Sequence, residues 1–364
     1  MANPTEQKGT YRRRPTPMPF LIPGAQVGRY VIERRLGIGA MSEVYLATDD
    51  ALGRRAAIKV LGSNQINNAT ITERFLREAR ALARMSHPNL IPVFEAGQTG
   101  EPLRPYYAME LLEGGDTQKL LDERGPLPSA VVALIGAEAA TGLGEAARAG
   151  IIHRDVKPAN LGISRHGVLK VTDFGLAKSY AADKSLTARG MVVGTADYIA
   201  PEQARGEELD ERADVYALGC TLFHLLTGRP PFRAKPGPSV KEYLDVMRMH
   251  LSAPVPDMRS EAPNSDGELA DAILAMMAKD RARRPTFAQI APKLARIAER
   301  LGGQLPRVTR QLFLVTGESA PVVQAALDDQ VDRMLMPRRR AWPRLVAFGV
   351  ILAAAIGLAL ALSR

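Results

Sequence analysis

The hydrophobic pattern of the chain changes near residue 110, and this change limits the folds that the chain can adopt. Before it, residues 30–50 and 54–61 are rich in β-branched and aromatic side chains around a glycine-rich turn, which predicts strands. After it, residues 131–150, 214–228 and 268–280 repeat apolar side chains at helical spacing. The sequence therefore predicts a small β-rich lobe followed by a larger helical lobe.

One helix is also predicted inside the small lobe, at residues 70–85. Thr70 or Thr72 is available as its N-cap. The apolar side chains that fall on one helical face are Ile71, Phe75, Leu76, Ala79, Leu82 and Ala83.

Composition narrows the classes of partner. Of the 364 residues, 46% are hydrophobic and 24% are charged, which is ordinary for a globular protein. The net charge of +9 would suit nucleic acid or an anionic membrane, but arginine clusters near the two ends of the chain largely explain it. We therefore expect no nucleic-acid partner. The single cysteine, Cys220, lies in an apolar run and is expected to be buried.

Outside the two lobes, three further segments are predicted. Residues 1–28 contain several prolines and a basic triplet without apolar periodicity, so we expect a disordered tail. The lobes then occupy residues 29–300. Residues 301–344 form a juxtamembrane segment, in which 306–336 could form a short amphipathic helix or pack on the larger lobe.

The last segment, residues 345–362, carries no charge and would extend about 27 Å as a helix, close to the thickness of a bilayer core of about 30 Å. Four arginines at 338–344 precede it, so the positive-inside bias predicts a single-pass inner-membrane protein with its lobes in the cytoplasm. The C-terminus would then lie on the far side. The alternative is a buried C-terminal helix of a soluble domain.

Two features of the small lobe are suited to binding phosphate, but each also has an ordinary structural explanation. The turn from Gly37 to Val44 would let the backbone approach a phosphate, yet any tight hairpin uses glycine. Lys59 lies in an apolar strand, where its charge needs an anion or a carboxylate such as Glu78. Alternatively, Lys59 and Glu78 are simply exposed.

Two polar segments of the larger lobe carry further candidate groups. The run HRDVKPAN at 153–160 cannot continue a strand or a regular helix, so it predicts a polar loop between apolar flanks. Asp173 follows a strand-like run and precedes Phe174 and Gly175. Asp173 and Asn160 offer the hard oxygen ligands that Mg²⁺ prefers. Taken singly, each of these segments could be a turn.

The order of these motifs is more specific than any one of them. A glycine-rich hairpin, a strand lysine, a helix glutamate, HRD with an asparagine five residues after the aspartate, DFG and APE follow one another along the chain. In this order the chain resembles a eukaryotic-like (Hanks-type) serine/threonine protein kinase of the kind found in bacteria, over about residues 29–300. The resemblance implies an α+β, bilobal protein-kinase fold, here followed by one C-terminal transmembrane helix.

The resemblance also implies roles for single residues. Asp155 would accept the proton of the substrate hydroxyl, Lys157 would steady the γ-phosphate, and Asn160 and Asp173 would hold Mg²⁺, with Mn²⁺ as a possible substitute. The ATP-binding residues implied in this way are Gly37, Ile38, Gly39, Ala40, Met41, Ser42, Val44, Ala57, Lys59, Glu78, Glu110 and Leu112. Structural support would come from Asp214 below the HRD loop and from a Glu202–Arg284 pair.

These residues predict a protein kinase that uses ATP and acts on serine and threonine hydroxyls of protein substrates. Ser42 replaces the third glycine of the turn without removing a catalytic group. Arg154 beside Asp155 suggests that a phosphorylated activation loop orders the site, with Thr187 as the first candidate phosphosite and Ser185 as the second. Autophosphorylation in trans would require a homodimer. The alternative is a catalytically silent kinase-fold scaffold held at the membrane.

Overall fold

The computed structural model describes residues 21–39, 42–62, 65, 68–100, 103–174, 196–234 and 239–302. All of them belong to one compact unit, Met1–Phe313. Ala40, Met41, Ser185, Thr187 and the predicted transmembrane span at 345–362 lie outside the described residues, as does nearly all of the segment 301–344.

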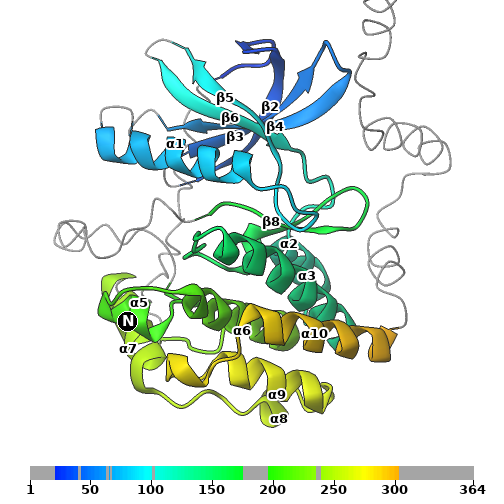
Figure 1. Cartoon of the computed structure of the whole chain (residues 1–364), viewed down its shortest axis with the longest axis vertical. Helices are drawn as coiled ribbons and strands as arrows, with labels where there is room; N and C mark the ends of the chain where they lie inside the picture. Colours follow the sequence, from blue (N-terminus) through cyan, green and yellow to red (C-terminus); the bar gives the residue numbers. More distant parts are fainter. Residues whose placement is uncertain are drawn as a thin grey trace, which may run out of the picture. The chain divides into compact units, whose positions relative to one another are not determined.

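A six-stranded antiparallel sheet forms the small lobe (Figure 1). Its strands are β1 (Gln26–Val27), β2 (Tyr30–Ile38), β3 (Ser42–Asp49), β4 (Arg54–Leu61), β5 (Val93–Thr99) and β6 (Arg104–Glu110), in the spatial order β1-β2-β3-β4-β6-β5. The predicted strands at 30–50 and 54–61 correspond to β2, β3 and β4. The glycine-rich turn joins β2 to β3, in which Gly37 lies opposite Val44.

The sheet begins earlier than the sequence indicated, because residues 21–28 were expected in a disordered tail. Gln26 and Val27 pair with β2, and the amide of Leu21 donates to the Tyr45 hydroxyl at 3.1 Å. Leu21 and Val27 are both buried in the small lobe. A two-residue strand is too short to show a hydrophobic period, so the pattern did not reveal it.

The single helix of the small lobe is α1 (Ala69–Arg84), which packs on the sheet through contacts with β5 and β6 (Figure 1). The predicted helix is therefore present, but its predicted cap is wrong. Asn68 is the N-cap, and its side chain accepts from the amide of Ile71 at 3.2 Å. Thr70 and Thr72 lie inside the first turn, where a threonine cannot act as the N-cap.

Alternation along β4 directs side chains to the two faces of the sheet. Ala56, Ile58 and Val60 are buried in one apolar cluster with residues of β2 and β6. Ala57 and Leu61 instead join the cluster that contains the apolar side of α1. Lys59 lies between Ile58 and Val60 in this strand, so its side chain points to the same face as α1. The alternation therefore places the side chain of Lys59 on the face of the sheet that α1 covers.

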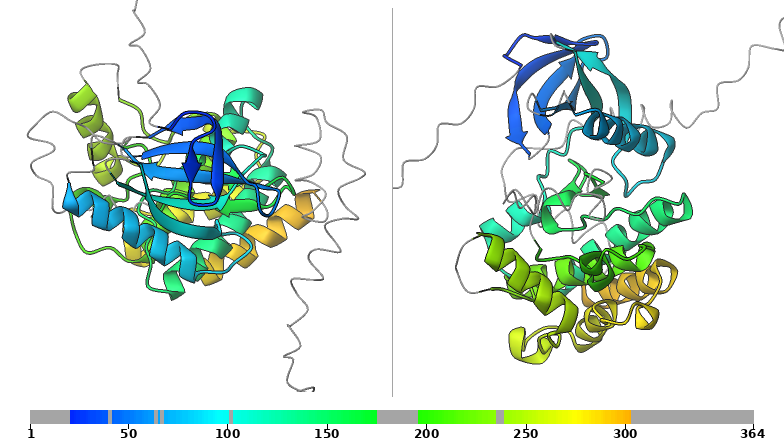
Figure 2. Two further views of the ribbon diagram at one scale, coloured as in Figure 1. Left: turned by 90° about the horizontal axis from the view of Figure 1, so that it is seen from above. Right: turned by 90° about the vertical axis from the view of Figure 1, so that its left-hand side faces the viewer.

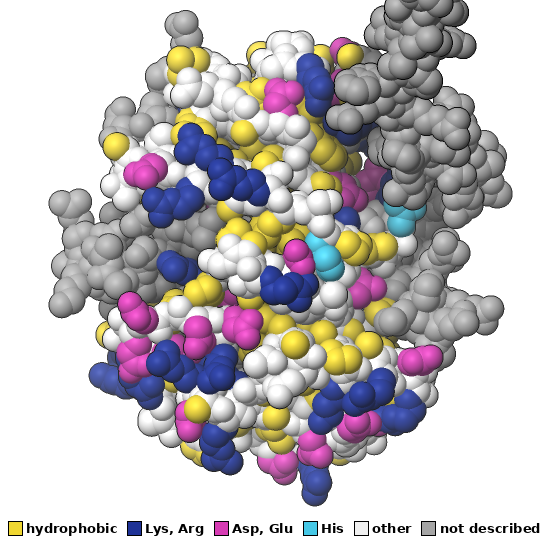
Figure 3. Space-filling model, viewed as in Figure 1, with side chains coloured by type: hydrophobic (Ala, Val, Ile, Leu, Met, Phe, Trp, Pro, Cys, Tyr) yellow, Lys and Arg dark blue, Asp and Glu magenta, His cyan; other side chains and the backbone are white. Residues whose placement is uncertain are grey.

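Helices form the larger lobe, as predicted. The long ones are α3 (Ser129–Arg148), α6 (Glu211–Thr227), α7 (Ser239–Ser252), α9 (Gly267–Met276) and α10 (Phe287–Gly302), and the shorter ones are α2 (Thr117–Arg124), α5 (Pro201–Arg205) and α8 (Met258–Glu261). Figure 2 shows these helices gathered together, with α3 packed against α6 and α10. On the face drawn in Figure 3, acidic and basic side chains are interspersed over the lower helices.

The interior of this lobe is mostly apolar, with a few buried polar or charged side chains such as Glu202, Asp214 and Arg284. Cys220, on α6, is fully buried, as the sequence predicted, and burial raises the pKa of its thiol to about 12. Within the described part of the chain, α3 is the one helix long and apolar enough to cross a bilayer. It is mostly buried among the other helices, which is also typical of the core helix of a soluble lobe.

A small two-stranded sheet, β7 (Leu161–Ile163) and β8 (Leu169–Val171), carries the two predicted polar segments. The loop at 153–160 leads into β7, and β8 leads into Asp173. The segment after α1 is bonded to β8, because the amide of Ile91 donates to the carbonyl of Val171 and the amide of Val171 donates to that of Asn89. These two hydrogen bonds hold the segment that follows α1 against β8, the strand that positions Asp173.

Candidate active site

Lys59 connects three separated segments of the chain. Its Nζ donates to Oε1 of Glu78, on α1, at 2.9 Å. It also donates to Oδ1 of Asp173, a residue that follows β8, at 2.9 Å. Lys59 is 8% exposed and Glu78 is 4% exposed, so both charges lie in the interior. A buried ammonium without such partners would be strongly unfavourable. The arrangement excludes the alternative in which Lys59 and Glu78 are merely solvated.

The charges in this cluster stabilise one another. Burial lowers the pKa of Lys59, but the carboxylates of Asp173 and Glu78 raise it more, so that it lies well above the usual value. Lys59 also lowers the pKa of Asp173. Burial raises the pKa of Glu78, and Lys59 opposes this rise. The cluster therefore holds one cation between two carboxylates.

The loop at 153–160 brings three predicted residues together. Lys157 Nζ donates to Asp155 Oδ2 at 3.0 Å, and Asn160 Nδ2 donates to the same oxygen at 3.2 Å and to the Asp155 carbonyl at 2.8 Å. Two donors on one oxygen fix the direction of the carboxylate. The loop thus presents an oriented carboxylate beside a cation and an amide.

Asp214 stabilises the backbone of this loop through hydrogen bonds, as the sequence predicted. Its Oδ2 accepts from the amide of His153 at 2.6 Å and its Oδ1 from that of Arg154 at 2.8 Å. Burial raises the pKa of Asp214 to about 7, although both of these amides lower it. Gln203, in the middle of α5, donates a hydrogen bond to the carbonyl of Arg154 at 3.0 Å.

His153 joins this loop to the Asp173 segment. The amide of Asp155 donates to His153 Nδ1 at 3.2 Å, and His153 Nε2 lies 2.9 Å from the carbonyl of Thr172. A neutral imidazole with its proton on Nε2 satisfies both contacts. The ring also packs on Phe174, with a centroid distance of 4.5 Å.

Backbone strain is concentrated in these two loops. Among the described non-glycine residues, Arg154 (φ 68°) and Asp173 (φ 54°) are the ones with positive φ. Such conformations cost about 1–3 kcal/mol each and persist only where the surroundings impose them. Here the imposing contacts are those of Asp214 and Gln203 on Arg154, and that of Lys59 on Asp173.

The predicted metal ligands fit a divalent cation in their donor chemistry. Asn160 uses its Nδ2 for Asp155, which leaves the amide oxygen as its ligand atom. Asp173 uses Oδ1 for Lys59 and is partly exposed, so its carboxylate can reach a bound ion. A carboxylate and an amide oxygen are the hard ligands that Mg²⁺ takes when phosphate oxygens and waters complete its shell.

Three of the predicted ATP-binding residues border the apolar cluster that also contains the apolar side of α1. Ala57 belongs to this cluster, and Val44 and Leu112 pack against it. Glu110, another of the predicted ATP-binding residues, makes two polar contacts. Its amide donates to the carbonyl of Pro92 at 3.2 Å and its carboxylate pairs with Lys170 Nζ at 3.4 Å. Its backbone amide is therefore already engaged within the lobe.

The glycine-rich turn is described only in part. Gly37 and Ile38 end β2, Gly39 follows the strand, and Ser42 begins β3. The amide of Gly39 donates to the carbonyl of Ser42 at 2.7 Å, which closes the turn. Because Ala40 and Met41 lie outside the described residues, their predicted contacts with phosphate stay predictions.

Sequence reasoning missed two residues that contact the site. Tyr107 of β6 donates its hydroxyl to Glu78 Oε1 at 2.8 Å, and Lys170 of β8 pairs with Glu110. Tyr107 lies directly opposite Lys59 in the sheet. Strand pairing would have revealed this neighbour, but a pairing register between β4 and β6 cannot be read from periodicity alone.

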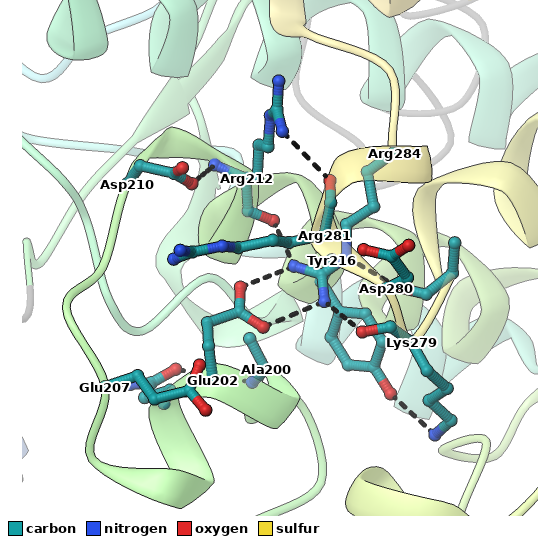
Figure 4. Close-up of polar contacts among 12 residues, drawn as sticks. Ala200, Glu202, Glu207, Asp210, Arg212, Tyr216, Lys279, Asp280, Arg281 and Arg284 are labelled. Atoms are coloured by element: carbon teal, nitrogen blue, oxygen red, sulfur yellow. Dashed lines mark hydrogen bonds and ion pairs between the residues drawn. The ribbon is translucent and has the colours of Figure 1, made fainter.

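The predicted Glu202–Arg284 pair braces the larger lobe (Figure 4). Arg284 Nη1 and Nη2 donate to the two oxygens of Glu202 at 2.6 and 2.9 Å, and both side chains are almost fully buried. Arg284 donates further to the carbonyls of Ala278, Lys279 and Arg212. The pair ties α5 to the segment before α10.

A family model described as "Protein kinase domain" matches residues 30–293. This chain belongs to the protein kinase family. The matched range contains the strands of the small lobe from β2 onward, both polar loops and the Glu202–Arg284 pair. The bilobal α+β fold expected from the sequence is therefore confirmed for this kinase domain.

Curated relatives of this kinase domain are bacterial serine/threonine kinases. Serine/threonine-protein kinase PknB of Mycobacterium leprae is 38% identical over 284 residues, which cover 77% of this chain and 44% of that protein. PknB of Mycolicibacterium smegmatis is 37% identical over 302 residues, with coverages of 82% and 47%. The chain thus spans less than half the length of these relatives.

The fold is also similar to that of a solved kinase domain. The crystal structure of the PknI kinase domain of Mycobacterium tuberculosis matches with a TM-score of 0.58 and 28% identity. The match covers 76% of this chain and 99% of that domain. The similarity therefore extends over a complete kinase domain.

Proposed function

We propose that this protein is a serine/threonine protein kinase that transfers the γ-phosphoryl group of ATP to hydroxyls of protein substrates. The observation that carries the proposal is the position of Lys59 within 2.9 Å of both Glu78 and Asp173, which brings α1, β4 and the segment after β8 to one point. A scaffold without catalysis would not require the buried charges of Lys59 and Glu78 to meet a third charge, that of the partly exposed Asp173, at the cost of desolvation.

The residues divide the reaction between them. Lys59 holds the α- and β-phosphates of ATP, and Asp155 accepts the proton of the acceptor hydroxyl. The acceptor oxygen then bonds to the γ-phosphorus as the bond to the β–γ bridging oxygen breaks, and ADP leaves. Lys157 compensates negative charge on the transferred group. Asn160 and Asp173 would hold Mg²⁺ or Mn²⁺, and the bound cation would neutralise charge on the phosphates.

A cavity of about 540 Å³ beside Lys157 supports a peptide acceptor. It is lined by residues of α2, by the loop at 157–159, by Asp197 and Tyr198, and by the segment that follows α6. A side chain next to the acceptor residue can enter this space while the hydroxyl faces Asp155. The restriction to serine and threonine is supported by Lys157, two residues after Asp155, and by the run GTADYIAPE at 194–202, which both resemble the serine/threonine class of kinases. The names of the relatives support it as well.

The test is phosphate transfer from labelled ATP by the full chain in detergent, with Mg²⁺ or Mn²⁺ and a generic basic protein. We expect incorporation on serine or threonine that is lost in Asp155→Asn, because the amide cannot accept the proton. Transfer that persists in Asp155→Asn would contradict the proposed base. Retained ATP binding without any transfer by the wild-type chain would favour the silent scaffold.

We also propose that the kinase is anchored in the inner membrane by residues 345–362, with its lobes in the cytoplasm. The uncharged apolar run and the four preceding arginines support this proposal. The full chain should sediment with membranes and resist alkaline extraction, whereas a chain ending at residue 344 should not. Equal extraction of the two chains would rule out the anchor.

Autophosphorylation in trans within a homodimer is the third part of the proposal. Arg154, beside the oriented Asp155, is the cation that a phosphate on Thr187 or Ser185 would meet. Mixing an Asp155→Asn chain with the wild-type chain should label the inactive chain at one of these two residues. Active enzyme that carries no phosphate at either residue would refute it.

A further inference from the structure

Tyr107 makes a hydrogen bond that the roles assigned so far do not use. It is fully buried on β6, directly opposite Lys59 of β4. Its hydroxyl donates to Glu78 Oε1 at 2.8 Å, and the same oxygen accepts from Lys59 Nζ at 2.9 Å. Two neighbouring strands thus each supply one donor to a single oxygen of a helix side chain.

The ring of Tyr107 is held in place from two sides. It packs against Phe75 of α1 with a centroid distance of 5.2 Å, and Lys59 Nζ lies 5.4 Å from its centroid. Phe75 lies three residues before Glu78, so the two side chains lie on one face of the helix. The ring therefore sets the distance between α1 and the sheet, and the hydroxyl sets the direction of Glu78.

We infer that Tyr107 is a positioning residue, which keeps the Glu78 carboxylate directed at Lys59 and thereby keeps Lys59 in place for the phosphates of ATP. The inference rests on the proposed kinase function. A buried carboxylate oxygen with one donor in place of two is less well satisfied, and hydrogen bonds to charged groups are the stronger ones. Without the hydroxyl, the ionised carboxylate of Glu78 is less stable, and it keeps Lys59 in position less well.

The groups that face Glu78 give this role a pH dependence. Burial raises the pKa of Glu78 and Asp173 raises it further, whereas Lys59 of β4 and the Tyr107 hydroxyl of β6 lower it. Removal of the hydroxyl removes one lowering contribution. Glu78 then takes up its proton at higher pH, and the acid limb of the activity profile moves in the same direction.

The same strand offers a matched control. Tyr106 is also buried, and its hydroxyl donates to Glu95 Oε1 at 2.7 Å, a bond of the same kind as that of Tyr107. Its side chain lies on the opposite face of the sheet, in the apolar cluster away from α1. Tyr106→Phe therefore removes a tyrosine–glutamate hydrogen bond of similar length, to a more exposed carboxylate, without touching Glu78.

The experiment compares the full chain with Tyr107→Phe, Tyr107→Leu and Tyr106→Phe, by phosphate transfer from pH 5.5 to 8.5. We expect Tyr107→Phe to move the acid limb upward by about one pH unit, and thereby to lower transfer on that limb by up to about tenfold, from the usual contribution of one hydrogen bond. Tyr106→Phe should leave the limb in place. In a Glu78→Gln background, Tyr107→Phe should move it no further.

Each outcome decides the matter. Wild-type transfer with the same acid limb in Tyr107→Phe overturns the inference, and a loss in Tyr107→Leu alone assigns the effect to ring packing and also overturns it. No transfer by the wild-type chain refutes the proposed function instead. The affinity for a fluorescent ATP analogue, measured at pH 6 and 8, then tests the inference, because equal values for wild type and Tyr107→Phe overturn it.

Discussion

Lys59 and Arg284 show how this protein carries full charges in its interior. Each cation meets a buried carboxylate, Glu78 for Lys59 and Glu202 for Arg284, and each makes further polar contacts. The further contacts matter because attraction between two buried charges offsets their desolvation only when the remaining donors are also satisfied. Arg284 uses its guanidinium for carbonyls as well as for Glu202, which an ammonium group could not reproduce.

We expect the Glu202–Arg284 pair to contribute much more to the free energy of unfolding than an ion pair on the surface does. Glu202→Gln leaves Arg284 buried with a reduced partner, so we expect a loss of about 3–5 kcal/mol in the free energy of unfolding. The matched control is Glu73→Gln, in the exposed pair with Arg77 on α1, where the loss should stay below about 0.5 kcal/mol. Urea unfolding followed by circular dichroism measures both. Equal losses would contradict the argument from burial.

Sequence reasoning found the residues of the site that lie within recognisable motifs, and it missed those that depend on pairing. Asp155, Lys157 and Asn160 occupy one short loop, so their meeting could be predicted. Lys59 and Asp173 are 114 residues apart, and only the resemblance to a family brought them together. Tyr107 belongs to no motif, and its contact with Glu78 arises from the register between β4 and β6.

At the scale of elements, close approach of backbones decides how the helices pack. Gly142 of α3 faces the carbonyl of Asn89, in the connection between α1 and β5. A Cβ at this position would lie 2.6 Å from that oxygen. The amide of Val171 donates to the same carbonyl, so the oxygen cannot move away freely. A glycine is therefore required for α3 to approach the segment that supports β8.

Gly142→Ala should consequently destabilise the protein, although alanine is the better helix former. We expect a net loss of about 1–3 kcal/mol, since overpacking against a fixed backbone exceeds the gain of about 1 kcal/mol in helix propensity. Gly267→Ala, at the start of α9, is the control, because nothing lies within 4 Å of its Cβ position. This control should be neutral or slightly stabilising. Thermal unfolding of both variants decides whether contact or propensity dominates.

The start of α1 offers a second prediction at this scale. Asn68→Ala removes the side chain that accepts from the amide of Ile71, so we expect a loss of about 1 kcal/mol. Asn68→Ser should retain most of the stability because serine also caps helices well. Thr70→Ala, within the first turn, should change it by less than about 0.5 kcal/mol. A larger effect at Thr70 than at Asn68 would restore the cap expected from the sequence.

Most helices and strands could be predicted from the sequence, but the residues at which they begin and end were harder to predict. Long apolar patterns identified α3, α6 and α9, because burial on most sides leaves a strong signal over many residues. The two-residue strand β1 and the cap of α1 were misjudged, since each depends on contacts of a few residues that propensity does not determine. The predicted membrane span lies outside the described residues and stays a prediction.

At the scale of the whole molecule, two buried histidines and one buried aspartate of the described residues contribute in opposite directions to the pH dependence of stability. Burial lowers the pKa of His224 to about 4 and that of His250 to about 3, and burial raises the pKa of Asp214 to about 7. Between pH 6.5 and 4 the unfolded chain protonates both histidines while the native state does not, so acidification lowers the free energy of unfolding. Asp214 acts in the opposite sense, because the native state takes up its proton first.

Through these three groups, the unfolded chain binds one proton more than the native state in this pH range. Their contribution to the free energy of unfolding therefore falls by about 1.4 kcal/mol for each pH unit of acidification. His250→Gln should reduce the slope of the free energy of unfolding against pH by this amount, and Asp214→Asn should make it steeper by the same amount. Urea unfolding at intervals from pH 4.5 to 6.5 measures the slopes. Parallel curves for the wild-type chain and His250→Gln would contradict the assignment, whatever the offset between them.

The burial of Cys220 has a practical consequence for spectroscopy. The chain contains one cysteine, and its thiol is fully enclosed in α6 and resists ionisation at neutral pH. Thiol-directed probes react with the thiolate, so the native chain presents them with almost no background target. A cysteine introduced on the exposed side of α1 would then carry the only label, and its signal could follow the distance of that helix from the sheet during nucleotide binding.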